Sequence, residues 1–126
     1  MNNPHYKSKL VVRPLDDGVS WVLEQDFYFT LDNHGLLYAR EGFCFDFASI
    51  PKILQWFEQP ATGKHRYAAF VHDWLCYKGF MTRYEADLVF LKFMKLDGVS
   101  WWKRNLMFAA VRLGGWLPWS KRHGDG

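Results

Sequence analysis

The pattern of apolar and polar positions changes near Ser49 and divides the chain into two parts. Before Ser49, β-branched and aromatic residues form short runs that are separated by the turn sequences LDDG and LDNHG. After Ser49, apolar residues recur three and four positions apart, which is the spacing of helices. The sequence therefore predicts an α+β fold, in which a small N-terminal antiparallel sheet or set of hairpins, with three or four strands, packs against three main helices.

The helical part is predicted to contain four segments. A short helix starts at Ser49, which is a suitable N-cap. Longer helices follow over about residues 64–77, 82–98 and 100–115. The clearest start is that of the second long helix, where Thr82 and Glu85 have the spacing of a capping box.

Length and composition indicate one domain spanning residues 1–126. Its predicted regions are β-rich 1–48, helical 49–115 and a basic Trp-containing tail 116–126. Two cysteines do not form a disulfide framework, and the N-terminus lacks the apolar core of a signal peptide. We therefore expect a reducing cytoplasmic location. The apolar runs fall short of the roughly 20 residues that cross a bilayer, so we expect no transmembrane segment.

Adjacent polar residues, His72 and Asp73, interrupt the apolar helical run KHRYAAFVHDWLCYKGF. Asp87 lies in the next helix, in a run that is apolar nearly all round. A buried carboxylate needs a partner, because its desolvation is otherwise too costly. Few residues join the two helices, so we expect them to pack antiparallel with His72 within reach of Asp87. Such a pair is either catalytic or a structural hydrogen bond.

Three stretches in order, FCFDFASIP, AAFVHDWLCY and EADLVFLKFMKLDGVSWW, resemble the phage and prophage family catalogued as domain of unknown function 1353. Its members share Gly-Phe-x-Thr-Asp-x-Ala-Ser-Ile-Pro, His-Asp-x-Leu-Tyr and Ala-Asp-x-x-Phe stretches. The resemblance covers roughly residues 8–115. Here Phe45 stands where Thr is common, and Cys76 falls just before the usual Tyr. The resemblance implies a phage origin and assigns no activity.

The stretch HDWLCY also resembles the His-Asp-x-x-Tyr helix motif of secreted phospholipases A2. In that family the His is general base for a water, the Asp binds Ca²⁺, and an Asp of the antiparallel neighbouring helix orients the His. The resemblance implies a similar helix pair here, with Asp87 as the orienting residue and Tyr77 one position late. The cysteine pairs and the Gly-rich calcium loop of that family are missing, so the likeness is confined to a short motif.

These residues suggest metal-assisted hydrolysis of an ester. An imidazole, with an ordinary pKa of about 6.5, can take a proton from water, and a carboxylate on its other nitrogen fixes the tautomer. We therefore assign His72 as base and Asp87 as its orienter. Asp73 together with Asp46 would hold Ca²⁺, which polarises an ester or phosphoryl oxygen. The candidate binding residues around this site are Ser49, Trp74 and Tyr77.

Other chemistries fit the sequence less well. Cys76 or Cys44 would be the nucleophile of a thiol mechanism with His72, but buried cysteines are usually inert. Zinc sites need three or four convergent ligands, and the paired spacing typical of them is missing. Nucleic-acid binding through WWKRN and WSKRHG is disfavoured by a net charge of only +3. Trp101 and Trp102, with the WLPWSKR tail, have the composition of a lipid-surface patch, although core packing is expected for most tryptophans.

Two function classes remain open from the sequence. The first is a small phage-encoded hydrolase that acts on ester bonds of lipid or of the cell envelope, with Ca²⁺ as its cofactor. The second is a non-enzymatic phage accessory protein, either a virion component or a binder of a host protein, whose His and Asp residues form a structural network. Either would be made in the host cytoplasm and would then stay there, join the virion or lie at the membrane periphery.

Overall fold

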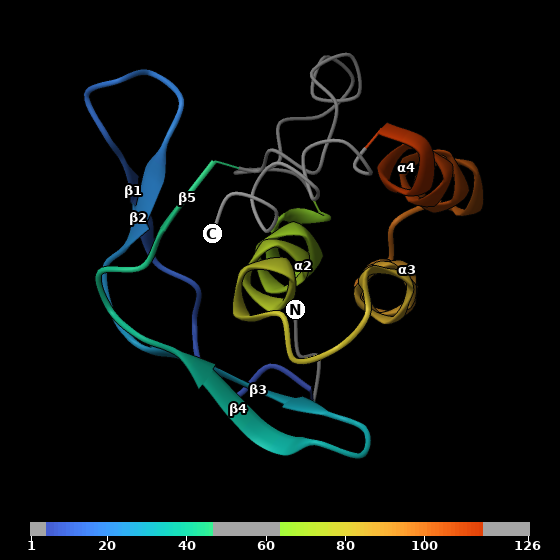
Figure 1. Cartoon of the computed structure of the whole chain (residues 1–126), viewed down its shortest axis with the longest axis horizontal. Coiled ribbons are helices and arrows are strands. Elements are labelled where there is room, and N and C mark those ends of the chain that lie inside the picture. The colour runs from blue at the N-terminus through green and yellow to red at the C-terminus, as the bar shows by residue number, and fades with distance from the viewer. Residues whose placement is uncertain (1–4, 47–63, 115–126) are drawn as a thin grey trace. The chain divides into compact units, whose positions relative to one another are not determined.

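The computed structural model describes residues 5–46 and 64–114 (Figure 1). These residues belong to two compact units, Met1–Asp46 and Phe47–Gly126, and each unit is described by itself below. All described strands lie in the first unit and all described helices lie in the second. This order confirms the α+β prediction. The helix predicted from Ser49 and the tail 116–126 lie outside the described residues.

The first unit contains two small antiparallel sheets. One sheet has the order β1-β2-β5 and consists of β1 Val12–Pro14, β2 Trp21–Leu23 and β5 Cys44–Phe45. The other sheet is the hairpin of β3 Phe27–Leu31 and β4 Gly35–Ala39. The described strands thus number five, more than the three or four predicted. The difference arises because the run VSWVLEQDFYFTL changes sheet between Leu23 and Phe27, and a strand pattern does not reveal which partner each half has.

The β3–β4 hairpin shows how the local sequence sets the register. Phe27, Phe29 and Leu31 are buried. Tyr28, which points to the other face, is exposed and lies opposite Tyr38. The turn needs left-handed backbone at Asn33 and Gly35, with φ of 70° and 71°, and these residue types tolerate it. The predicted turn LDNHG is therefore confirmed.

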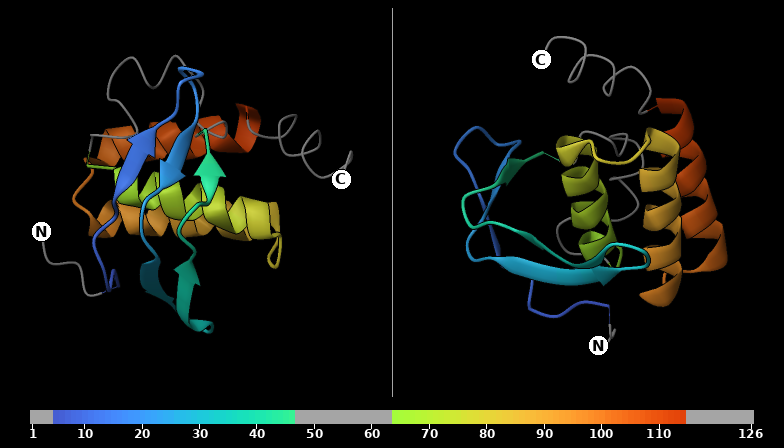
Figure 2. Two further views of the ribbon diagram at one scale, coloured as in Figure 1. Left: turned by 90° about the vertical axis from the view of Figure 1, so that its left-hand side faces the viewer. Right: turned by 60° about the horizontal axis from the view of Figure 1, so that its bottom comes forward.

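The second unit contains α2 Arg66–Lys78, α3 Arg83–Leu96 and α4 Trp101–Gly114. They form one row, in which α3 lies between α2 and α4 and successive helices run antiparallel (Figure 2). Helix α2 ends at Gly79, which has the left-handed φ of 70° typical of a helix C-terminus. The antiparallel helix pair predicted from the short connection is therefore confirmed.

Helix α3 starts as the capping box predicts. The Glu85 amide donates to the Thr82 hydroxyl at 3.1 Å, and the Thr82 amide donates to the Glu85 carboxylate at 2.8 Å. These two bonds satisfy backbone donors that a helix N-terminus leaves unpaired. They set the residue at which α3 begins, and therefore which of its side chains face α2.

The three helices bury several large apolar side chains. The fully or almost fully buried ones include Phe70, Leu75, Phe90, Phe93, Met94, Met107 and Val111. No helix in the described range 64–114 is both long enough and apolar enough to cross a membrane. Against this apolar background, the polar or charged residues His65, His72, Asp73, Asp87 and Asp97 are also buried, so each of them needs a partner.

Candidate functional site

His72 and Asp87 are in direct contact between α2 and α3. The Nε2 atom of His72 lies 2.6 Å from Oδ1 of Asp87, and their side chains are only 1% and 0% exposed. The imidazole also packs against Phe90, with ring centroids 4.9 Å apart. The sequence-based prediction that an Asp87 oxygen lies within hydrogen-bonding distance of His72 is therefore confirmed.

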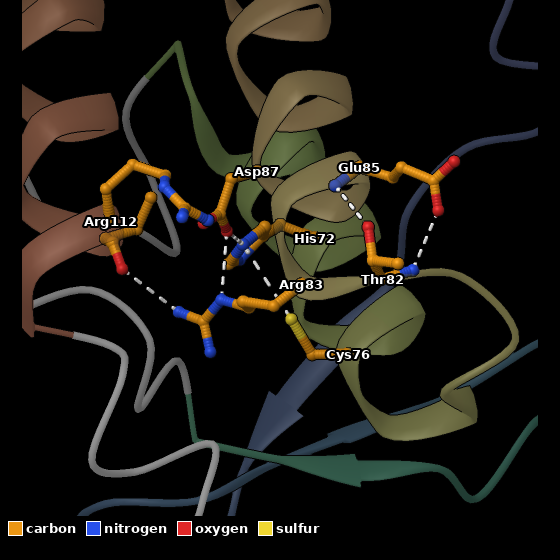
Figure 3. A network of polar contacts seen from close by, with 8 residues as sticks. His72, Cys76, Thr82, Arg83, Glu85, Asp87 and Arg112 are labelled. Atoms are coloured by element: carbon orange, nitrogen blue, oxygen red, sulfur yellow. Dashed lines mark hydrogen bonds and ion pairs between the residues drawn. The ribbon is translucent and has the colours of Figure 1, made fainter.

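Asp87 also binds two arginines (Figure 3). Arg83 Nε donates to Oδ1 at 3.0 Å, and Arg112 Nη1 donates to Oδ2 at 2.8 Å. The carboxylate thus joins α2, α3 and α4 through His72, its own helix and Arg112. We call these four residues, His72, Arg83, Asp87 and Arg112, the polar clamp.

The charges of the polar clamp keep Asp87 ionised. Burial by itself raises the pKa of a carboxyl group. At Asp87 this effect is outweighed by the hydrogen bond and charge of His72, by the charge of Arg83 and by the hydrogen bond from Arg112, so the pKa is below its ordinary value. The ionised form is therefore the one that the folded protein stabilises.

The two arginines differ in their surroundings. The Arg83 side chain is only 12% exposed, and its Nη2 also donates to the Val111 carbonyl of α4 at 3.2 Å. The Arg112 side chain is 37% exposed and stacks on the Tyr84 ring at 5.0 Å. Arg83 is therefore held on both sides within the helix row, whereas Arg112 closes the clamp at its solvent edge.

Cys76 lies one turn after His72 on the same face of α2. Its Sγ is 3.7 Å from His72 Nε2, which is the nitrogen that also contacts Asp87. In a thiol mechanism the base takes the thiol proton on one ring nitrogen, while its orienting carboxylate holds the other. Here both contacts fall on one nitrogen and the thiol is buried, which is the arrangement of a packed core cysteine. Cys44, the other candidate nucleophile, is exposed in the first unit.

The other predicted site residues are distributed differently. On α2, Asp73 and Trp74 are buried at 3% and 5% exposure, and Tyr77 is 63% exposed. Asp46 is exposed in the first unit, and Ser49 lies outside the described residues. The metal hypothesis needs Asp73 to face an opening where a cation enters, whereas this side chain is almost completely buried. Among residues 5–46 and 64–114, no three or more His, Cys, Asp or Glu side chains are grouped so that they could hold a metal ion.

The sequence reasoning missed Arg83 and Arg112. A signal for Arg83 was present, because it precedes Asp87 by four positions and such residues are neighbours on a helix surface. No comparable signal exists for Arg112, which is 25 residues from Asp87 and reaches it only when α4 packs on α3.

Comparison with known proteins identifies a family and no individual relative. A family model described as "Protein of unknown function (DUF1353)" matches residues 21–111, which is most of the chain. No curated protein and no solved structure matches the chain.

Proposed function

Since the chain belongs to this family of unknown function, we propose from its polar clamp that it is a non-enzymatic phage accessory protein, which acts by binding another protein. In this proposal the His–Asp pair stabilises the helix row that presents the binding surface. The observation that supports it most strongly is that Asp87, 0% exposed, has three charged or polar donors from three helices.

The first argument concerns access. A general base must reach the proton that it removes, directly or through one water. The His72 side chain is 1% exposed and its Nε2 is engaged by Asp87. A buried imidazole that is held by a carboxylate and packed on an aromatic ring has the features of a core residue.

The second argument concerns charge. A general base becomes positively charged when it accepts a proton, and a carboxylate beside it helps by offsetting that charge. The Asp87 carboxylate is already offset by Arg83 and Arg112 at 3.0 and 2.8 Å. The clamp is therefore better suited to holding helices together than to cycling a proton.

A second candidate function is the Ca²⁺-assisted hydrolase with His72 as base, Asp87 as orienter and Asp73 with Asp46 as metal ligands. It is favoured by the short imidazole–carboxylate contact of 2.6 Å, which is the orienting geometry that such a mechanism requires. Its substrate class would be an ester of a lipid or of the cell envelope.

Replacement of His72 distinguishes the two functions. We expect His72→Ala to lower the free energy of unfolding by about 2–4 kcal/mol, because it removes a buried ring and a donor to Asp87. We expect the unmodified chain to hydrolyse p-nitrophenyl butyrate and fluorescent phospholipid vesicles no faster than buffer does, with or without millimolar Ca²⁺. His34→Ala, at an exposed position of the first unit, is the control and should leave the melting temperature unchanged.

The opposite result would favour the hydrolase. Ca²⁺-dependent turnover that His72→Ala abolishes, while the melting temperature stays near that of the unmodified chain, would contradict the accessory role.

A further inference from the structure

Helix α4 carries an apolar stripe on the side that faces away from its neighbour. The stripe consists of Trp102, Leu106, Ala109 and Leu113, all of which are exposed. At about 100° per residue these positions fall within an arc of roughly 60°. The buried residues Met107 and Val111 lie on the opposite side of the helix. α4 is thus apolar on two sides, and packing within its own unit accounts for one of them.

The exposed side chains are large. Trp102, Leu106 and Leu113 are 53%, 43% and 83% exposed. Among the described helices, α4 packs mainly on α3. Contiguous exposed apolar patches of a few hundred Å² are often functional.

We propose that the stripe pairs with the same stripe of a second copy of this chain, as two antiparallel α4 helices related by a twofold axis. Successive residues of the stripe, at positions 102, 106, 109 and 113, are four, three and four positions apart, so the spacing is the same from either end of the helix. In antiparallel pairing, Trp102 therefore meets Leu113 of the second copy, and Leu106 meets Ala109. A large residue faces a smaller one at every level, which allows close approach of the two helices.

The charges beside the stripe are compatible with this pairing. On one flank lie Lys103 and Ala110, and on the other lie Asn105 and Arg112. A twofold axis brings each flank against the same flank of the second copy, so Lys103 lies beside Ala110 and Arg112 lies beside Asn105. The two Lys103 side chains are about 13 Å apart along the axis, at about 1.5 Å per residue. Like charges are therefore kept apart without any change of conformation.

The size of the stripe sets the expected affinity. A whole aromatic side chain buries roughly 150–250 Å², so the partly exposed residues of the stripe offer roughly 300–400 Å² per copy. Stable interfaces bury about 800 Å² per partner, and smaller ones belong to weak or transient complexes. We therefore expect a weak dimer, with a dissociation constant in the micromolar range or above.

Analytical ultracentrifugation of the full chain over micromolar to millimolar concentrations tests the proposal. Leu106→Lys and Ala109→Glu should each weaken dimerisation at least tenfold. An equimolar mixture of the two variants should recover it, because the introduced lysine then meets the introduced glutamate in one contact across the interface, and the native leucine and alanine meet in the other. The control Leu36→Lys, at a 59% exposed position of β4, should dimerise like the unmodified chain.

Three results would overturn the proposal. A chain that stays monomeric up to millimolar concentration has no such interface, and a dimer that Leu106→Lys leaves intact uses another surface. A monomer that instead binds phosphatidylcholine–phosphatidylglycerol vesicles through Trp102 would assign the stripe to lipid. Circular dichroism checks that the variants are folded, and Ala109→Glu alone gives the same test if Leu106→Lys unfolds. This inference does not rest on the accessory role, since enzymes and binding proteins both dimerise.

Discussion

Replacement of Asp87 by Asn tests the polar clamp most directly. The substitution keeps the size and shape of the side chain and removes its charge. The amide can still hydrogen-bond to His72, but its NH₂ group is a donor and cannot accept a bond from an arginine. Arg83 and Arg112 then lie close together with no anion between them. The expected effect is therefore electrostatic and does not involve a cavity.

The magnitude follows from burial. Removing one partner of a buried ion pair typically costs about 3–5 kcal/mol. Arg112 is 37% exposed and can turn toward water, whereas Arg83 is 12% exposed and is also held by the Val111 carbonyl. We therefore expect Asp87→Asn to lower the free energy of unfolding by about 3–4 kcal/mol, a large part of the roughly 5–15 kcal/mol of a typical domain.

Urea denaturation at neutral pH, followed by far-UV circular dichroism, measures this loss. Circular dichroism at helical wavelengths reports on α2, α3 and α4. The matched control is Asp16→Asn, which makes the same chemical change at an exposed position and should alter the free energy by less than about 0.5 kcal/mol. A loss of less than about 1 kcal/mol for Asp87→Asn would refute the reasoning, because the carboxylate would then contribute no more than one neutral hydrogen bond.

Three further predictions concern the charge of Asp87, the start of α3 and the end of α2. The pKa of Asp87 is lowered in the folded state, so its charge contributes its full stabilisation above the ordinary pKa of about 3.9 and loses it as the pH falls through the folded value. The difference in unfolding free energy between the unmodified chain and Asp87→Asn should therefore shrink below about pH 4. A difference that stays constant with pH would contradict this. Thr82→Ala should cost about 1 kcal/mol through loss of the cap, and Thr82→Ser much less, as measured by urea midpoints; equal midpoints for the two variants would count against the capping box. Gly79→Ala should lower the free energy of unfolding by about 1 kcal/mol, because alanine tolerates a φ of 70° poorly, and Gly79→Asn should lower it less. A lower melting temperature for Gly79→Asn than for Gly79→Ala would contradict this explanation.

Local features of this chain could be predicted because they depend on residues close in sequence. The capping box at Thr82 and the stop at Gly79 each require only a few neighbouring residues, and both are confirmed. The contact between His72 and Asp87 was also predictable, since a short connection forces the two helices to be antiparallel and a carboxylate in an apolar run needs a partner.

Tertiary structure decided which residues from distant segments join the site. Arg112 and Asp87 are separated by 25 residues, and nothing in the helical period of α4 shows which face of that helix meets α3. The exposed stripe illustrates the same limit: Met107 and Leu106 are adjacent apolar residues, but one is buried and the other is 43% exposed. Trp101 and Trp102, 70% and 53% exposed, are exceptions to the core packing expected for most of the tryptophans. The sequence determined where the helices begin and end, because those choices depend on local backbone hydrogen bonds, whereas the packing of α4 on α3 decided which side chains are buried and which charges meet.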